Sequence, residues 1–141
     1  MTCKKILCNL FKEKVGEDMS YNKNIILEML SSTFWDEIES FVERIVMDYK
    51  DDDLIDIFEQ PTDYTLLDSI QAMRVLDFFT EQDDEKERIY GKLQIEASIE
   101  GYVHWDDEVE WLGDKEECIE VAFDFDVHDG ICSNLKLAYG I

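Results

Sequence analysis

Acidic side chains gather at even-numbered positions in two segments of the chain, and their spacing could do chemistry. Glu96 and Glu100 lie in the first segment, and Glu120, Asp124 and Asp126 lie in the second. Residues two apart on a β-strand point to the same face and lie about 6.6 Å apart. If both segments are strands, these carboxylates form a regular array. Such an array could bind the lysine and arginine side chains of a partner, or a divalent cation through oxygen donors.

Both segments have the alternation that such an array requires. From Arg88 to Trp105 the odd positions are apolar or glycine, and the even positions are mostly polar. A period of two with one apolar face is typical of a half-buried β-strand. Residues 118 to 127 alternate in the same way, with Ile119, Val121 and Phe123 among the odd positions. The odd face is therefore expected to be core, with Trp105 in it, and the even face to carry the carboxylates.

Asp129-Gly130 predicts the turn of the last hairpin. A two-residue turn there would set Phe123 against Lys136, whereas a three-residue loop over 129–131 keeps the apolar residues on one face. We therefore expect the longer loop, with Gly130 in the left-handed region. The expected pairs are Phe125 with Leu135, Phe123 with Leu137, and Val121 with Tyr139.

The first half of the chain predicts short helices. These cover residues 4–14, Asn24 to Leu30, about 33–49, and Leu54 to Glu59. Ser31 to Thr33 are expected to interrupt the second helix, and Thr33 with Asp36 resembles a capping box for the third. Asp51 to Asp53 are expected to cap the fourth, and Pro61 to end it.

Residues 64–80 fit a helix or a strand, and we favour a strand over Ser69 to Thr80, with a polar turn over Glu81 to Glu87. A further turn is expected at Gly113-Asp114. The fold class is then α+β, with N-terminal short helices packed on one face of a C-terminal antiparallel meander of three to four strands. One domain over 1–141 is expected, helical over about 1–60 and a sheet over about 64–141.

The charge limits the classes of partner. The chain has 141 residues, with 35 Asp and Glu against 13 Lys and Arg, for a net charge of −22. The first 23 residues have a net charge of +2, so the acidity belongs to the remainder. A surface of this sign repels nucleic acid and anionic membranes and attracts basic proteins. We expect no direct nucleic-acid or membrane binding.

The cysteines and the hydropathy indicate a compartment. Cys3, Cys8, Cys118 and Cys132 form no C-x-x-C pair, and no run of 18 apolar residues is present. The short apolar run after Lys5 is interrupted by Asn9, so no secretory signal is expected. A cytoplasmic location is the simplest expectation.

The sequence contains four candidate sites for catalysis or metal binding. Glu120, Asp124 and Asp126 could hold a divalent ion, but no calcium-binding loop motif is present. Asp63 with Asp84-Glu85-Lys86 matches a nuclease pattern only formally, because Lys86 falls in the expected turn and the charge opposes a polyanionic substrate. A zinc site is opposed by distance along the strands, since the expected register pairs His128 with Cys132 and places Cys118 about 33 Å away. The candidate zinc ligands are His104, Cys118, His128 and Cys132, of which His104 and Cys118 could also form a thiolate and base pair.

We therefore expect no enzyme, no cofactor and no metal. The sequence favours a non-enzymatic acidic inhibitor that occupies the basic nucleic-acid-binding surface of a partner, similar in composition to DNA-mimicking anti-CRISPR or anti-restriction proteins. An immunity protein or antitoxin that neutralises a basic nuclease toxin is the alternative, and an acidic accessory domain without such a partner is a further one. Aromatic residues among charges are common anchors of protein interfaces. The expected partner-binding residues are Glu96, Glu100, Tyr102, Trp111, Glu120, Asp124 and Asp126.

Overall fold

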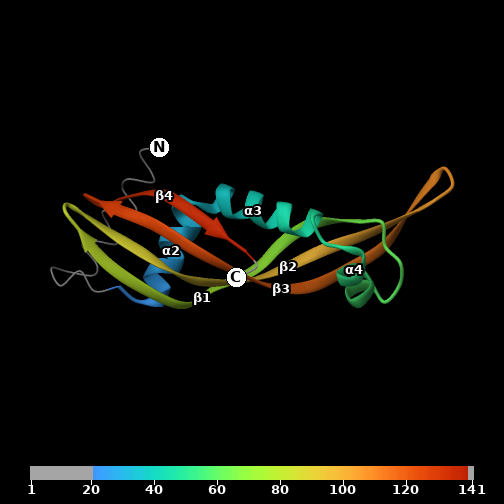
Figure 1. Ribbon diagram of the computed structural model, residues 1–141, viewed down its shortest axis with the longest axis horizontal. Helices are drawn as coiled ribbons and strands as arrows, with labels where there is room; N and C mark the ends of the chain where they lie inside the picture. The colour runs from blue at the N-terminus through green and yellow to red at the C-terminus, as the bar shows by residue number, and fades with distance from the viewer. Residues whose placement is uncertain (1–20, 140–141) are drawn as a thin grey trace. The chain divides into compact units, whose positions relative to one another are not determined.

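The computed structural model describes residues 21–139, within which three helices precede four strands (Figure 1). The helices are α2 (Lys23–Thr33), α3 (Trp35–Met47) and α4 (Asp51–Phe58). The strands are β1 (Tyr64–Asp83), β2 (Lys86–Trp105), β3 (Glu108–His128) and β4 (Ile131–Ala138), in the order β1-β2-β3-β4. The predicted α+β class is confirmed, with the helices packed on an antiparallel meander. The helix predicted over residues 4–14 lies outside the described residues.

Helix α2 continues through the polar segment that was expected to end it. The Oδ1 atom of Asn22 accepts a hydrogen bond from the N–H of Ile25 at 2.9 Å, which caps the helix start. The buried side begins with Ile25 and extends to Thr33, which is 5% exposed. The predicted end at Leu30 is therefore wrong, because burial of the last turn outweighs the weak helix propensity of serine and threonine.

Helices α3 and α4 confirm the helices that were predicted over about 33–49 and over Leu54 to Glu59. Ile38, Val42 and Ile45 form the buried stripe of α3 at helical spacing. Helix α4 begins at Asp51, three residues earlier than predicted, because its aspartates lie in the first turn, where free amides and the positive end of the helix dipole stabilise them. The carboxylate of Asp53 accepts a hydrogen bond from the N–H of Lys50 at 3.2 Å.

The strands are longer than the alternation indicated. Residues 64–80 belong to strand β1, so the strand interpretation is confirmed, and the turn contains only Asp84-Glu85. Strand β3 begins at Glu108, and the predicted turn at Gly113-Asp114 is wrong. Each hairpin turn instead begins with an aspartate at positive φ, a conformation that aspartate tolerates better than most residues. These are Asp84 (φ 52°), Asp106 (φ 54°) and Asp129 (φ 52°).

The β3–β4 register confirms one part of the prediction and corrects another. The turn is the two-residue one, since His128 pairs with Ile131 and Val127 pairs with Cys132. The register then shifts by one residue between Asp124 and Asp126, so that Phe123 pairs with Leu137, as predicted. Asn134 lies in the bulge with φ 58°, and Gly130 has φ 76°, in the left-handed region as expected. The bulge restores the apolar pairing that the short turn alone would break.

The residues divide into two compact units, and strands β1, β2 and β3 contribute to both. Of the described residues, unit 1 contains 21–37, 73–94 and 120–139, and unit 2 contains 38–72 and 95–119. The expectation of a single domain stays a prediction.

Each unit has its own apolar core. In unit 1, Phe34 at the end of α2 packs on Phe125 of β3 with ring centroids 5.5 Å apart. In unit 2, the Oγ1 of Thr65 donates to the carbonyl oxygen of Val46 at 2.6 Å and ties β1 to α3. The ring of Phe58 covers Gly101, so α4 lies against the odd-numbered face of β2.

Candidate functional site: a carboxylate cluster in unit 2

The negative charge is concentrated in unit 2. Its 60 residues contain 19 Asp and Glu against 3 Lys and Arg, a net charge of −16 out of −22 for the chain. Unit 2 also holds most of the large apolar side chains that are exposed among residues 21–139. These unit 2 side chains are Met47, Ile55, Tyr64, Leu66, Trp105, Val109 and Trp111. The acidic surface is therefore also the surface with the most exposed apolar groups.

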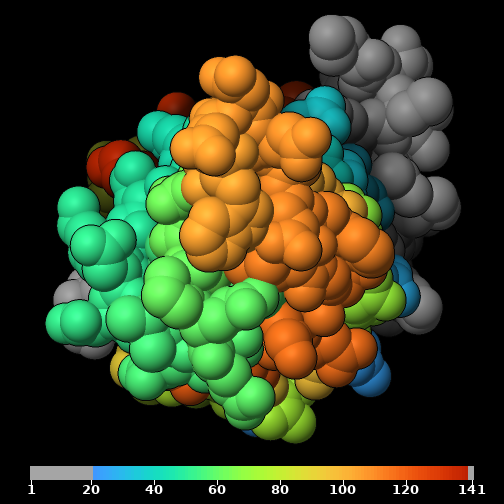
Figure 2. Space-filling model, turned by 90° about the vertical axis from the view of Figure 1, so that its right-hand side faces the viewer, coloured from blue at the N-terminus to red at the C-terminus, as the bar shows by residue number. Residues whose placement is uncertain are grey.

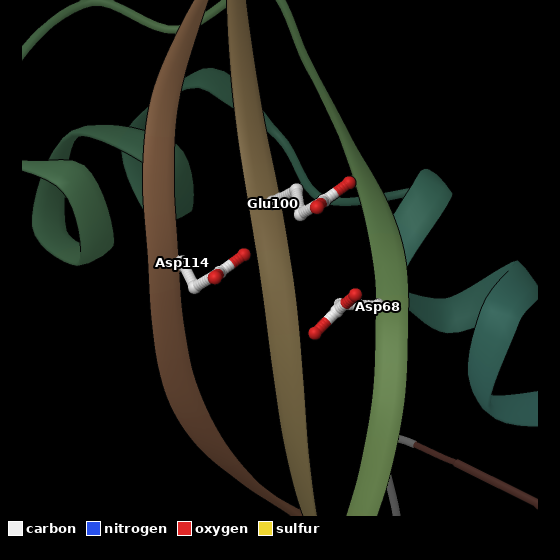
Figure 3. Close-up of side chains that lie close together, drawn as sticks. All are labelled: Asp68, Glu100 and Asp114. Carbon is white, nitrogen blue, oxygen red and sulfur yellow. The ribbon is translucent and has the colours of Figure 1, made fainter.

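In this unit, Asp68, Glu100 and Asp114 point toward one another from three adjacent strands (Figure 3). One carboxylate oxygen of each lies within 4.8 Å of the others. Asp68 belongs to β1, Glu100 to β2 and Asp114 to β3, so strand pairing creates the group. We call these three residues the carboxylate cluster.

The protonation equilibria reflect the crowding of negative charge. Loss of solvent raises the pKa of the Asp114 carboxyl, and the charges of Asp68 and Glu100 raise it further. The phenol of Tyr102 donates a hydrogen bond to Glu100 at 2.8 Å, and this bond raises the pKa of Tyr102. Among residues 21–139, no ion pair joins a lysine or arginine to the cluster. Its charge is therefore available to a cation from outside.

An aromatic group flanks the cluster. The ring of Tyr102 stacks on Tyr64 with centroids 5.0 Å apart and an interplanar angle of 12°. Tyr64 also approaches His104 at 5.9 Å. The backbone N–H of Asp63 donates to the carbonyl oxygen of Tyr102 at 2.8 Å, and the Asp63 carboxylate accepts from the N–H of His104. These two hydrogen bonds fix the start of β1 against β2, and they thereby position the Tyr64 ring beside Tyr102.

The cluster can do two things chemically. Three carboxylate oxygens from separate strands are hard donors of the kind that calcium and magnesium use. The same oxygens can also accept hydrogen bonds from lysine and arginine side chains. The ion site considered from the sequence used Glu120, Asp124 and Asp126, whereas the structure brings together a different set.

Two of the predicted partner-binding carboxylates are already engaged in unit 1. Asp124 accepts from Arg88, with Nη2 at 2.7 Å and Nε at 3.1 Å from its oxygens. Asp126 accepts from the Asn134 amide at 3.0 Å, and the Lys86 ammonium lies 3.4 Å away. The Asn134 bond and Lys86 hold the pKa of Asp126 below its usual value. Asp124 and Asp126 therefore already have partners within the chain, which their even positions in the sequence did not indicate.

A mixed-charge hollow surrounds these pairs in unit 1. Its lining combines three basic side chains with three acidic ones and two neutral residues. The lining residues are Asp83, Lys86, Arg88, Asp124, Asp126, Asn134, Leu135 and Lys136. Arg88 also contacts Glu81 at 3.2 Å, and its guanidinium lies 4.4 Å from the centre of the Tyr90 ring. Opposite charges neutralise one another here, unlike in the carboxylate cluster.

The remaining predicted residues are accessible to different degrees. Glu96 and Glu120 are exposed, and Glu100 and Tyr102 are half-buried. Trp111 is 56% exposed, and its role at an interface stays a prediction. Trp105 is 61% exposed, so its predicted place in the core is wrong. Parity assigns a side chain to a face of the strand, but Trp105 lies at the strand end, beyond the residues that α4 covers.

The structure separates the candidate zinc and thiolate residues. Cys132 is buried opposite Val127, whereas His128 is exposed at the turn and pairs with Ile131. The expected pairing of His128 with Cys132 is wrong. Because Glu100 lies by Asp114 and the strands are antiparallel, Cys118 lies toward Glu96, about 26 Å along the hairpin from His104.

The residues of the nuclease pattern also have other partners in the structure. Lys86 begins strand β2 and contacts Asp126, so its expected place in the turn is wrong. The carboxylate of Asp63, its acidic counterpart in unit 2, is bonded to the backbone of His104.

Asp68, Asp114 and Trp105 are the residues that sequence reasoning missed. Asp114 was expected in a turn, and Asp68 lay just before the expected strand. Asp68 and Asp114 stand at even positions, as Glu100 does. This shared parity indicates a common face only when β1 and β3 are extended to their full lengths. Comparison with protein-family models, with curated proteins and with solved structures found no match.

Proposed function

We propose that this chain is a non-enzymatic binding protein whose unit 2 occupies the basic, nucleic-acid-binding surface of a partner protein. The observation that carries the proposal is the net charge of −16 on the 60 residues of unit 2. Self-repulsion on this scale opposes folding, and a basic partner would relieve it. This is the physics of the DNA-mimicking anti-restriction and anti-CRISPR proteins that the composition resembles.

The carboxylate cluster supports the proposal because it holds unpaired charge at fixed positions. Asp68, Glu100 and Asp114 come from three strands, so their spacing is held by the sheet. A phosphate-binding arginine or lysine of the partner would gain charge-assisted hydrogen bonds there. Preorganised charge of this kind favours fast, salt-sensitive association.

The proposal includes a cellular compartment for the protein, and two findings bear on it. Within residues 21–139 no helix is long and apolar enough to cross a membrane. Cys118 is an exposed free thiol, a state that a reducing compartment maintains. We therefore place the protein in the cytoplasm as part of this proposal.

The test is capture from lysate by the immobilised full-length chain at low and at high salt. We expect retention of a basic nucleic-acid-handling protein at low salt and its release at high salt. If the captured protein is a nuclease toxin, the immunity or antitoxin alternative is supported. If no basic nucleic-acid-handling protein is retained, the proposal fails.

Matched charge reversals then locate the interface. Glu96→Lys with Glu116→Lys changes two exposed residues of unit 2, and Glu28→Lys with Glu85→Lys changes two exposed residues of unit 1 by the same net charge. We expect the first pair to weaken binding by about tenfold or more, equivalent to about 1.4 kcal/mol, and the second to have a much smaller effect. Equal losses would mean that net charge alone drives binding and would contradict a site in unit 2.

A further inference from the structure

The β2–β3 hairpin tip, residues 105–111, displays large apolar side chains that the fold does not bury. Trp105 is 61% exposed, Val109 is 50% exposed and Trp111 is 56% exposed. Single exposed apolar residues are ordinary on protein surfaces, but three within one turn region form a patch, and patches mark interaction sites. The core of unit 2 does not bury these side chains, so they are accessible to a partner.

The tip is held in a defined conformation. Asp106 begins its two-residue turn at φ 54°, and the indole Nε1 of Trp105 donates to the carboxylate of Glu110 at 2.8 Å. This bond crosses the hairpin and orients the indole while its ring stays exposed. An anchor that is already ordered loses less conformational entropy when it binds.

Acidic residues surround the indoles. Asp106, Asp107, Glu108 and Glu110 are all exposed, and none takes part in an ion pair within the described part of the chain. Aromatic anchors inside a polar rim are the usual composition of an interface hot spot. The rim selects partners of positive charge.

Figure 1 shows the hairpin tip (orange) extending past α4, and Figure 2 shows this segment in the foreground beside the green α4 region. The tip is therefore accessible in unit 2.

We propose that this tip anchors unit 2 by inserting Trp105 and Trp111 between apolar side chains that lie among the lysines and arginines of a partner protein. The inference rests on the proposed function and names the chemistry of its partner surface. The net charge of −16 on unit 2 opposes binding to nucleic acid, to anionic lipid and to a second copy of this chain, because each would meet like charge.

The test uses two basic probes of equal charge, of which one has apolar side chains and the other has none. The first is a helical peptide with lysines along one side and leucines along the other, and the second is poly-lysine of equal charge. Trp35→Phe leaves Trp105 and Trp111 as the only tryptophans in the full-length chain. We expect the lysine-leucine peptide to shift tryptophan emission to the blue and to protect it from acrylamide quenching. Poly-lysine should bind without either effect.

Substitution separates the anchors from the charge. Trp105→Ala and Trp111→Ala should each weaken binding of the lysine-leucine peptide by about tenfold and leave poly-lysine binding unchanged. The matched control is Phe79→Ala, an aromatic residue of unit 1 that is 54% exposed, and it should change neither. Circular dichroism checks that each variant is folded, and Trp105→Phe tests the indole N–H with the ring retained.

Unshifted emission, or unchanged peptide affinity in both tryptophan variants, would overturn the anchor. Salt-sensitive binding of both probes would in that case still support the proposed function. If neither probe binds at low salt, the proposed function itself fails. Self-association that disappears in the tryptophan variants would identify a second copy as the occupant and would also overturn the proposal.

Discussion

Gly101→Ala tests how α4 is held on the sheet of unit 2. The ring of Phe58, the last residue of α4, lies directly over the Cα of Gly101 on β2. A Cβ at this position would lie 2.6 Å, 2.7 Å and 2.9 Å from three ring carbons, whereas ordinary contact begins at 3.4 Å. Phe58 is only 6% exposed, so the ring has little space into which it can move.

The expected magnitude follows from two opposing effects. Overpacking of a buried contact costs about 1–3 kcal/mol, and replacing glycine by alanine recovers about 0.4–1 kcal/mol through the unfolded state. Gly101→Ala should therefore lower the free energy of unfolding by about 1–2 kcal/mol. With Phe58→Leu the obstructing ring is gone, and the same alanine should be neutral or stabilising. The coupling energy of this pair should be about 2 kcal/mol.

Urea unfolding of the wild type, both single variants and the double variant, followed by circular dichroism, measures this cycle. Additive effects, with coupling below about 0.5 kcal/mol, would refute the contact. A loss below that size for Gly101→Ala alone would show that the ring moves aside freely, and α4 would then not depend on this close approach.

Two further predictions concern protonation. Asp114→Asn should raise the urea midpoint at pH 7, because it removes a charge that its neighbours repel. The folded-state pKa of Asp114 is raised, so the wild-type protein recovers stability as the pH falls through that pKa. The stability advantage of the variant should therefore shrink toward about pH 4. An advantage independent of pH would contradict this account. Asn134→Ala should cost about 1–2 kcal/mol, because alanine disfavours φ 58° and cannot bond to Asp126, whereas Asn134→Gly should lose only the bond. The folded-state pKa of Asp126 is lowered, so the stability from its bond to Asn134 is present above the unfolded-state pKa of Asp126 and is lost as the pH falls through the folded-state pKa. Equal urea midpoints for the alanine and glycine variants at pH 7 would argue against backbone strain at the bulge.

Local pattern was sufficient for the elements themselves. The alternation of β2 predicted its buried face, and Leu93, Ile95 and Ile99 are fully buried there. The Asp129-Gly130 signal placed the last turn because that pair accepts positive φ at both positions. These features depend on residues close together in the chain, so the sequence alone can reveal them.

Three features required the tertiary structure. Strand pairing decides which carboxylates meet, and Asp68 and Asp114 join Glu100 from positions 32 and 14 residues away. Whether a helix covers the end of a strand decides burial, so Trp105 is exposed although its parity indicated core. The concentration of charge in unit 2 arises because two separated segments, 38–72 and 95–119, fold together. Sequence alone determined that the chain is acidic and which residues alternate, whereas contacts between distant segments decided where its unpaired charge is presented.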